Sequence, residues 1–347
     1  MRIGIIAPPW LTVPPRAYGG TEAVIDSLAR GLAGQGHRVL LAAAAGSTCP
    51  VEQVPGSAGP DPAHVGRGQD ELRHVLGAYA AMGSMDVIHD HTLSGPLLRL
   101  APPGTAVVST VHNRIDALTG PVYRAIGRNA SLLAISEHQR SEAQGVRIGG
   151  VIHHGIEAAA IPVGAGDGGY ACFLGRMHPD KGVLTAIRVA RRAGVPLRIA
   201  AKMQSSGELE YFREVVGPEL GGDIEYVGEV GAREKYELLG GAFALLNPIQ
   251  WSEPFGMVMI EAMATGTPVV GTPRGAAPEI VEDGTTGFIR DTPKALAAAL
   301  ARCPELRRAD CRAATETQFS AGRMVREHLK FYARCRNSRS GAEALPV

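Results

Sequence analysis

Residues 253–261 read EPFGMVMIE and decide the fold of this 347-residue chain, because they join a buried strand to the start of a helix. Proline is favoured in the first turn of a helix, so Glu253 is predicted to lie just before a helix over Phe255–Ala264. Glu261 then falls one to two turns into that helix. The free N–H groups and the positive dipole end of the helix are therefore expected between two carboxylates.

The residues before Glu253 strengthen this interpretation. The apolar stretch Ala242–Trp251 is typical of a buried parallel strand, and open α/β sheets bind ligands where a strand leads through a loop into a helix. Helix amides can bind phosphates, and the two carboxylates can bind the hydroxyls of a sugar and of a ribose. The segment therefore favours a nucleotide diphosphate sugar as ligand, whereas an isolated pair of glutamates would more often be two solvated surface carboxylates.

The bulk composition narrows the class of protein. A chain of 347 residues with 45% hydrophobic residues suits two domains with full cores. Its 35 basic and 34 acidic residues nearly cancel, which predicts no nucleic-acid partner and argues against tight docking on membranes. Apolar runs are strand-sized, so neither a transmembrane segment nor a signal peptide is expected. The five cysteines are odd in number and form no C-x-x-C pair, which favours the cytoplasm.

Strand-like and helix-like segments alternate along the chain, which is typical of an α/β fold with parallel sheets. The predicted strands of the first half are Arg2–Ala7, Arg38–Ala43, Asp86–Asp90, Ala106–Val111, Leu132–Ser136 and Gly150–His153, with helices over Thr21–Ala33 and Asp70–Gly83 and a surface loop over 46–66. Those of the second half are Tyr170–Leu174, Leu197–Ala201, Ile224–Val227, Ala242–Leu246, Pro268–Gly271 and Gly287–Ile289, alternating with helices.

The segment Glu157–Tyr170 lies between the two series and is a linker by composition. Its glycines at 164, 166 and 169 satisfy the dinucleotide fingerprint G-x-G-x-x-G. That motif must follow a strand and open a helix, and here it does neither. We therefore interpret the segment as a flexible linker and not as a cofactor site.

Three motifs of the second half occur together in one known family. They are the E-x7-E of Glu253–Glu261, the Gly-Thr-Pro-Val turn at Gly266–Val270 and the P-E-[IV]-[IV] helix at Pro278–Val281. The whole segment Leu245–Gly287 resembles the retaining, nucleotide-sugar-dependent glycosyltransferases of family 4. This resemblance implies the GT-B fold, in which two Rossmann-like domains have parallel sheets that face each other across a cleft.

The resemblance also implies how the chain is divided. An acceptor-side Rossmann-like domain is expected over residues 1–160, and a donor-binding domain over residues 168–318. A C-terminal amphipathic helix over 319–340 is expected to cross back and pack on the first domain, as such a helix does in the GT-B family.

Two cations follow the strand Tyr170–Leu174 in the sequence FLGRMHPDKGV. Arg176 and Lys181 at the carboxyl end of a strand can hold a diphosphate while charge builds on the leaving group. From spacing alone they could equally be solvated. The resembled family has G-R-x4-K-G here, in contact with the diphosphate, which implies catalytic roles for both.

Further donor contacts follow from the resemblance. Glu253 is expected to hold the sugar hydroxyls and Glu261 the ribose. The loop Val227–Leu239 is expected to hold the nucleobase through its backbone, at Val230. The start of the helix after Glu253 is expected to bind the phosphates through Phe255, Gly256, Met257 and Val258.

The first half contributes a glycine pair and histidines. Gly19 and Gly20 precede a helix predicted to be capped at Thr21, so the backbone there can approach a ligand closely. The resemblance places this loop beside the donor phosphates and the acceptor. It also implies that His112, in STVHNR, is catalytic and lies beside the reactive carbon of the donor sugar.

A metal site is the alternative for the histidines in DVIHDHT. His89 and His91 share one face of a strand beside Asp90, so two metal ligands are geometrically possible. No D-x-D motif is present, however, and the resemblance implies an enzyme without metal or other cofactor. Asp90 and His91 are instead expected to cap the strand end and line the acceptor site.

The predicted function is transfer of a sugar from a UDP-, GDP- or ADP-sugar to a hydroxyl acceptor, with retention of anomeric configuration. The acceptor could be a small molecule, a glycan or a lipid-linked molecule. A nucleotide-sugar epimerase on the same fold and a hydrolase are the enzymatic alternatives, although the two glutamates are expected to be too far apart for a hydrolase. A two-lobed sugar-binding protein without catalysis is a third alternative, and such proteins are normally exported.

Overall fold

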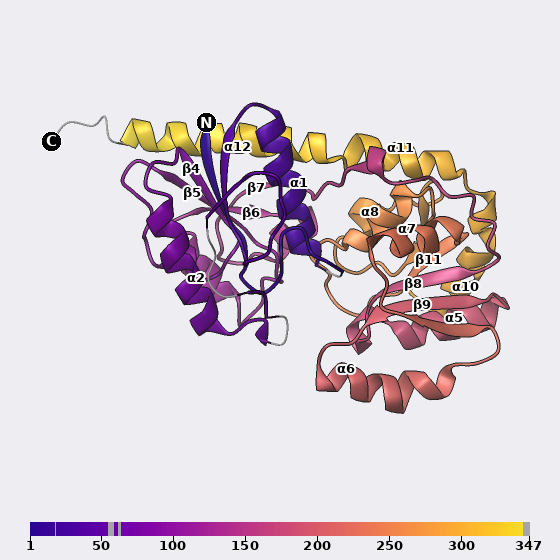
Figure 1. Ribbon diagram of the computed structural model, residues 1–347. Helices are drawn as coiled ribbons and strands as arrows, with labels where there is room; N and C mark the ends of the chain where they lie inside the picture. The colour runs from indigo at the N-terminus through magenta and orange to yellow at the C-terminus, as the bar shows by residue number, and fades with distance from the viewer. Residues whose placement is uncertain (18, 55–58, 62–63, 343–347) are drawn as a thin grey trace. The chain divides into compact units, whose positions relative to one another are not determined.

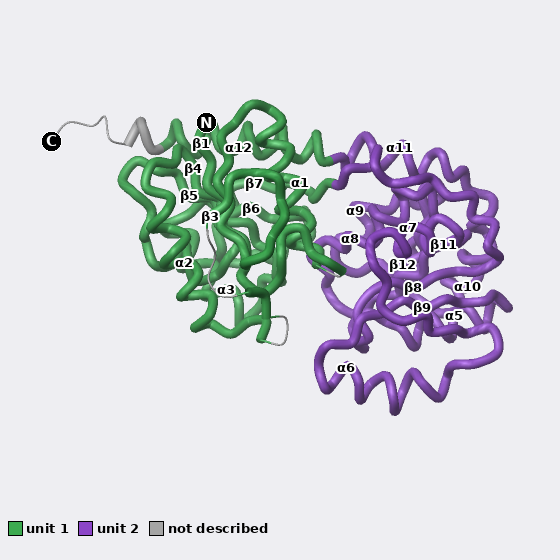
Figure 2. Tube along the Cα trace, in the orientation of Figure 1, with its two compact units in different colours: residues 1–155, 321–347 green, residues 156–320 purple. Residues whose placement is uncertain are grey.

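A computed structural model describes residues 1–17, 19–54, 59–61 and 64–342 (Figure 1). The chain forms two compact units (Figure 2). Unit 1 contains residues 1–155 and 321–347, and unit 2 contains residues 156–320. Each unit is built on one parallel sheet, as the alternation of strands and helices predicts.

Unit 1 has a seven-stranded parallel sheet in the order β3-β2-β1-β4-β5-β6-β7. Its strands are β1 Arg2–Ile6, β2 Arg38–Ala42, β3 Glu52–Val54, β4 Val87–Asp90, β5 Ala106–Thr110, β6 Ser131–Ala134 and β7 Ile148–Val151. Its α-helices are α1 Gly20–Gly34, α2 Gly68–Ala81, α3 Gly120–Ile126, α4 Glu137–Glu142 and α12 Ala321–Ala342. Helix α12 packs on α1 and β5, so the end of the chain is part of the first sheet's cover.

Unit 2 has a six-stranded parallel sheet in the order β10-β9-β8-β11-β12-β13. Its strands are β8 Ala171–Arg176, β9 Leu197–Lys202, β10 Ile224–Gly228, β11 Ala244–Asn247, β12 Val269–Gly271 and β13 Gly287–Ile289. Its α-helices are α5 Val183–Ala193, α6 Ser206–Tyr211, α7 Ala232–Gly241, α8 Met257–Ala264, α9 Ala277–Ile280, α10 Pro293–Arg302 and α11 Arg308–Gln318. Strand β8 pairs with β9 and β11, so the loops after these strands meet at the same edge of the sheet.

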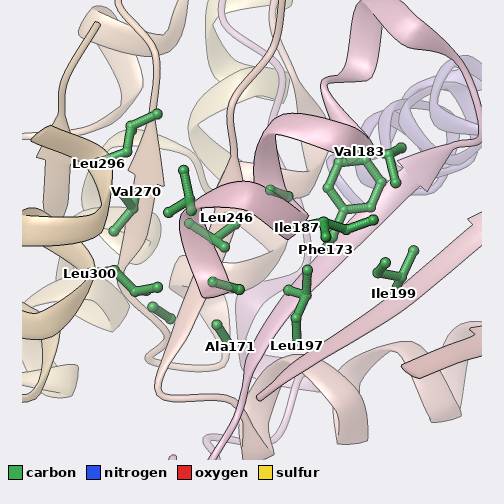
Figure 3. Close-up of a cluster of buried hydrophobic side chains, with 14 of the residues drawn as sticks. Ala171, Phe173, Val183, Ile187, Leu197, Ile199, Leu246, Val270, Leu296 and Leu300 are labelled. Atoms are coloured by element: carbon green, nitrogen blue, oxygen red, sulfur yellow. The ribbon is translucent and has the colours of Figure 1, made fainter. Parts of the chain in front are cut away.

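The core of unit 2 explains why these segments fold as strands and helices. Side chains of the central strands, such as Phe173 and Leu246, meet the apolar face of α5 at Ile187 and that of α10 at Leu300 (Figure 3). All four are at most 1% exposed. Burying each large apolar side chain stabilises a fold by about 1.5–3 kcal/mol, so this layer fixes the sheet that carries the loops.

One predicted surface loop contains a strand. Residues 46–66 include β3, whose Glu52 pairs with Leu40 of β2 at the edge of the sheet. Two of its three residues are exposed, so the segment lacks the apolar run by which buried strands are detected. Residues 55–58 and 62–63 of the predicted loop lie outside the described residues.

The segment Glu157–Tyr170 is not the flexible linker expected from its composition, because it is hydrogen-bonded into unit 2. The Gly164 N–H donates to the carbonyl of Thr265 at 3.0 Å, and the Gly166 N–H donates to the carbonyl of Gly240 at 2.9 Å. A Cβ atom on Gly164 would lie 2.2 Å from the Gly240 carbonyl oxygen. The glycines of this segment therefore permit close backbone packing.

Candidate active site

Lys181, Trp251 and Glu253 form the centre of the candidate site in unit 2. Glu253 Oε2 accepts a hydrogen bond from Trp251 Nε1 at 2.9 Å and forms an ion pair with Lys181 Nζ. The Lys181 and Glu253 side chains are each 14% exposed. Lys181 Nζ also lies 5.1 Å from the centre of the Trp251 ring, within cation–π distance. The structure thus brings together a predicted phosphate ligand and a predicted sugar ligand.

The backbone fixes where these side chains lie. Lys181 ends a 3₁₀ turn, Pro179–Lys181, and a Cβ atom on the following Gly182 would lie 2.0 Å from the Pro248 carbonyl oxygen. The Glu253 carbonyl accepts the Ala276 N–H at 3.0 Å, from the loop before α9. Loops that follow three different strands therefore position the pair at the edge of the sheet where parallel-sheet proteins bind ligands.

The helix after Glu253 begins later than predicted. Helix α8 starts at Met257, with Gly256 as its N-cap at φ 93°, so Pro254 lies in the preceding loop and outside the first turn. Phe255 is 2% exposed and meets Phe319 edge to face, so only its backbone could contact a ligand. Partly exposed residues form the start of the helix: Gly256, Met257 and Val258. Their position leaves the N–H groups of the first turn available to an anion.

Glu261 lies one turn into α8 and is paired with a residue that the sequence did not single out. Its Oε1 atom accepts a hydrogen bond from Lys235 Nζ of α7 at 2.6 Å. Burial alone would lower the pKa of Lys235, but the Glu261 carboxylate and the Tyr236 side chain outweigh burial and raise it. The loop carrying Val230 ends where α7 begins, so the predicted base-binding loop leads directly to the predicted ribose ligand.

Arg176 contacts a different carboxylate from the two glutamates of the E-x7-E motif. Its Nη1 atom lies 3.4 Å from Glu208 Oε1, and Arg176 pairs in register with Lys202 on the neighbouring strand. Lys202 is 9% exposed, and its Nζ atom donates to Gln204 Oε1 at 2.8 Å. Two cations therefore end adjacent strands beside one carboxylate.

The charge state of Glu208 fits this arrangement. Burial would raise the pKa of Glu208, but the backbone N–H groups of Gln204 and Ser205 and the nearby Arg176 and Lys202 outweigh burial and lower it. Glu208 is also the capping-box glutamate of α6, which fixes its position. The carboxylate stays ionised, and it balances only one of the two cations.

His112 belongs to a cluster of buried histidines in unit 1. Its Nε2 atom lies 2.8 Å from His91 Nδ1, and its ring stacks on that of His154 with centroids 5.6 Å apart. Burial, with a smaller contribution from His328, lowers the pKa of His112 to about 4. His112 is therefore neutral at pH 7 and can donate or accept one hydrogen bond.

The cluster extends from His91 to the C-terminal helix. His89 Nδ1 lies 2.6 Å from the Tyr332 hydroxyl, and His328 of the same helix lies 5.4 Å from the His89 ring, centre to centre. Burial holds the pKa values of His89 and His91 well below 6.5 and lowers that of His328 to about 4. The described residues contain no group of three or more His, Cys, Asp or Glu side chains placed to bind a metal ion.

Asp90 was expected to line the acceptor site, but the structure encloses it. It is 0% exposed and accepts hydrogen bonds from the Tyr79 hydroxyl at 2.8 Å and from the Thr92 N–H at 2.8 Å. Burial raises the pKa of Asp90 to about 7. A Cβ atom on Gly95 would lie 2.0 Å from Asp90 Oδ2. Asp90 thus closes the strand end and the following turn, and offers no surface to a substrate.

The glycine pair of the first loop also differs in detail. Helix α1 begins at Gly20 and its N-cap is Gly19, which offers no side-chain cap, so Thr21 is not the cap. A Cβ atom on Gly19 would lie 2.7 Å from Pro15 Cβ. Gly19 therefore permits close packing within the loop, where Pro15 and the Glu22 carboxylate lie beside it.

The sequence did not predict four residues of the site: Lys202, Glu208, Lys235 and Trp251. Lys202 and Trp251 each end or follow a buried strand, so the rule that located Arg176 could have found them. Glu208 lies three residues after Ser205, which is the spacing of a capping box. Lys235 carries no such signal, because its partner Glu261 lies 26 residues away in sequence.

Comparison with known proteins agrees with this geometry. The family model described as "Glycosyl transferases group 1" matches residues 168–305, and the one described as "Glycosyltransferase Family 4" matches residues 18–159. Together they span most of both units. The chain belongs to glycosyltransferase family 4. Its fold is GT-B, and its activity is glycosyl transfer.

Individual relatives of this family 4 member are consistent with this assignment. The phosphatidyl-myo-inositol mannosyltransferase of Mycolicibacterium smegmatis is 29% identical over 321 residues, covering 83% of this chain and 80% of the relative. The structure of AviGT4, a glycosyltransferase involved in avilamycin A biosynthesis, has a TM-score of 0.74 at 25% identity and covers 97% of this chain and 98% of that chain. HepE of Anabaena, solved with UDP and glucose, shares the fold with a TM-score of 0.76 at 18% identity, covering 96% and 99%.

Proposed function

We propose that this family 4 glycosyltransferase uses a nucleotide diphosphate sugar and transfers its sugar to a hydroxyl acceptor with retention at the anomeric carbon. The observation that carries the proposal is the Lys181–Glu253 pair beside the start of α8. A cation, a carboxylate and free helix amides at one sheet edge match the phosphate and the sugar of such a donor. The proposal assigns the donor to unit 2 and the acceptor to unit 1.

Donor binding rearranges the ion pair. In the structure, Lys181 neutralises Glu253. A diphosphate carries more negative charge than one carboxylate, so Lys181 turns toward it and leaves Glu253 free to accept hydrogen bonds from the sugar. The Trp251 N–H keeps Glu253 in place during this exchange. Glu261 takes the ribose hydroxyls, and the backbone around Val230 takes the base.

The chain's own cations stabilise the leaving diphosphate. Arg176, Lys181 and Lys202 lie on or just after β8 and β9, and the first turn of α8 adds its N–H groups. These groups act where negative charge grows as the glycosidic bond breaks. We therefore expect transfer without a metal ion, and turnover measured in excess EDTA tests this expectation.

We expect no covalent intermediate on a side chain. His112 is neutral at pH 7 because its pKa is about 4, so it cannot act as a general acid. It can position an oxocarbenium-like state through its ring nitrogen or its backbone carbonyl. The acceptor hydroxyl then attacks the anomeric carbon from the face that the diphosphate leaves, and its proton passes to an oxygen of the departing diphosphate. A glycosyl adduct on any side chain, detected by mass spectrometry of a slowed variant, would contradict this mechanism.

Only the relatives indicate which sugar and which acceptor to test first. The M. smegmatis relative is named as a mannosyltransferase acting on phosphatidyl-myo-inositol, so a mannosyl donor and a lipid-linked acceptor are the first combination to test. Small-molecule and glycan acceptors are to be tested after it.

No helix among the described residues is long and apolar enough to cross a membrane. All five cysteines lie within the described residues and form no disulfide, which supports our assignment to the cytoplasm.

The test is a panel of UDP-, GDP-, ADP- and TDP-sugars, with and without acceptors. We expect release of one nucleoside diphosphate that depends on an acceptor, and a product whose anomeric configuration by NMR equals that of the donor. Release at the same rate without acceptor would indicate a hydrolase. Conversion of the donor to its epimer without acceptor and without net release would indicate an epimerase. An inverted product would refute retention.

A further inference from the structure

An exposed run of leucines lies on unit 1, in a segment to which no donor contact is assigned. Residues 97–100 read LLRL, and Leu97, Leu98 and Leu100 are 38%, 38% and 40% exposed. Leu97 ends the 3₁₀ turn η2, Gly95–Leu97, and Leu98 and Leu100 follow it. Exposed apolar residues grouped in one segment can mark an interaction site. This run is therefore a candidate contact surface.

A neighbouring segment carries further exposed leucines. Turn η2 contacts both α2 and α3, which Figure 2 labels within unit 1. Leu72 and Leu76 of α2 are 40% and 55% exposed and share one helix face at i and i+4. Seven of the ten exposed large apolar side chains in the described residues lie in unit 1, so the exposure is concentrated there.

A cavity of about 310 Å³ adjoins the run, large enough for a small head group. Its lining includes Tyr79, Arg99, Leu100, Arg128 and Asn129. Arg99 Nε donates to Asn129 Oδ1 at 2.7 Å. Arg99 has φ 53°, an uncommon conformation for a residue with a side chain, so the backbone is held in a specific shape at this point.

The cavity is positively charged. No carboxylate lines it, and across the described ranges neither Arg99 nor Arg128 forms an ion pair. Two guanidinium groups without an acidic partner favour an anion, and a phosphate fits their planar donors. The net charge of the whole chain, +1, conceals this local excess.

We propose that the leucine–arginine face, defined as Leu72, Leu76, Leu97, Leu98, Arg99, Leu100 and Arg128, docks on a membrane surface that carries anionic phospholipids. A head-group phosphate enters the cavity, and the leucines enter the boundary between head groups and acyl chains. A second copy of the chain fits less well, because a two-fold contact would bring the same unpaired arginines together. This inference is independent of the proposed donor and acceptor.

Flotation of the full chain with vesicles tests the proposal without measuring transfer. We expect the protein to float with phosphatidylglycerol vesicles and not with phosphatidylcholine vesicles, and added salt should weaken the binding. The triple variant Leu97→Ser, Leu98→Ser, Leu100→Ser and the double variant Arg99→Gln, Arg128→Gln should each reduce bound protein at least tenfold. Their matched controls are Leu209→Ser and Arg213→Gln on α6 and the turn that follows it, which should bind as the wild type does.

Several results would overturn the proposal. These are equal binding to both kinds of vesicle, no binding to either, or equal loss in the two control variants. Saturable binding of glycerol phosphate without vesicle binding would identify a soluble ligand instead. A dimer in sedimentation that the leucine variant abolishes, without vesicle binding, would identify a second copy as the partner.

Discussion

The two units handle buried polar groups in opposite ways. In unit 2, Glu253 and Glu261 each form an ion pair with a lysine, and both glutamate side chains are 14% exposed. In unit 1, burial keeps the pKa values of the clustered histidines, including His91 and His112, so low that they are neutral. Charges persist where a charged ligand is expected, and they are absent where the chain needs hydrogen bonds and shape.

Physical cost explains this difference. An ion pair at a partly exposed sheet edge keeps part of its hydration, and it can be exchanged for another anion. An unpaired imidazolium inside unit 1 would lose its hydration without gaining a partner, so those rings stay neutral. The difference predicts that unit 2 is sensitive to loss of a charge and unit 1 is sensitive to gain of one.

Removing the charge of Glu253 should have the largest effect on transfer. The variant Glu253→Gln keeps the shape but loses the acceptor for the sugar hydroxyls, so we expect kcat to fall about 100- to 1,000-fold. Glu210→Gln, an exposed glutamate of α6, is the matched control and should be unchanged. Initial rates with saturating donor measure both. Equal rates for Glu253→Gln and the wild type would remove Glu253 from the mechanism.

Lowering the pH, which adds positive charge to unit 1, should have the next largest effect, in this case on the stability of the fold. The folded pKa of His112 is about 4, below the ordinary 6.5, so between these values the unfolded chain binds more protons. Stability is full above pH 6.5 and falls as the pH drops toward 4, by about 3 kcal/mol from His112 alone. In unit 2, Glu208 has a lowered pKa and its contribution is lost only below about pH 4.5.

The two tryptophans separate the units in this experiment. Trp10 lies in unit 1 and Trp251 in unit 2, so urea unfolding of the Trp251→Phe variant by fluorescence follows unit 1 alone. We expect the urea concentration at the midpoint of unfolding to decrease when the pH is lowered from 7.5 to 5. The His328→Leu variant should show a smaller decrease, because it lacks one titrating ring. A midpoint independent of pH would show that the cluster is not buried as described.

Glu261 should affect the donor more than the chemistry. Glu261→Gln loses the charge that binds ribose and leaves Lys235 without its anion, so we expect the donor KM to rise about tenfold. The value of kcat should change little, because the ribose is remote from the reacting carbon. A large fall in kcat with constant KM would assign Glu261 to the reaction itself.

Trp251 should give the smallest effect. Trp251→Phe removes one hydrogen bond to Glu253 and keeps the ring beside Lys181, so a three- to tenfold fall in kcat is expected. Trp251→His can restore an N–H donor and should recover part of the loss. If both variants behave as the wild type does, Lys181 alone positions Glu253.

The sequence predicted the two parallel sheets and most of their strands because buried parallel strands are continuous apolar runs. It also placed Lys181 and Glu253 after strands whose carboxyl ends meet at one sheet edge, but it did not predict the ion pair between them. The sequence did not predict that Asp90 is fully buried. Its burial depends on Tyr79, 11 residues away, and on the turn at Gly95. Pairing across such distances leaves no local pattern.

Other differences have local causes. Helix α8 starts at Met257 because Gly256 adopts the left-handed conformation, which overrides the preference of Pro254 for a first turn. The segment Glu157–Tyr170 resembles a linker because close packing and flexibility both favour glycine. Composition alone does not distinguish these two uses.

Binding of nucleoside diphosphates to the Lys181→Ala variant tests the central claim most directly, namely that the ion-paired site of unit 2 binds the donor. Calorimetry with UDP, GDP and ADP should show that the wild type binds at least one of them. Lys181→Ala should weaken that binding at least tenfold, and Lys294→Ala, an exposed lysine of α10, should not. Unchanged affinity in Lys181→Ala, or no binding of any of the three by the wild type, would contradict the account.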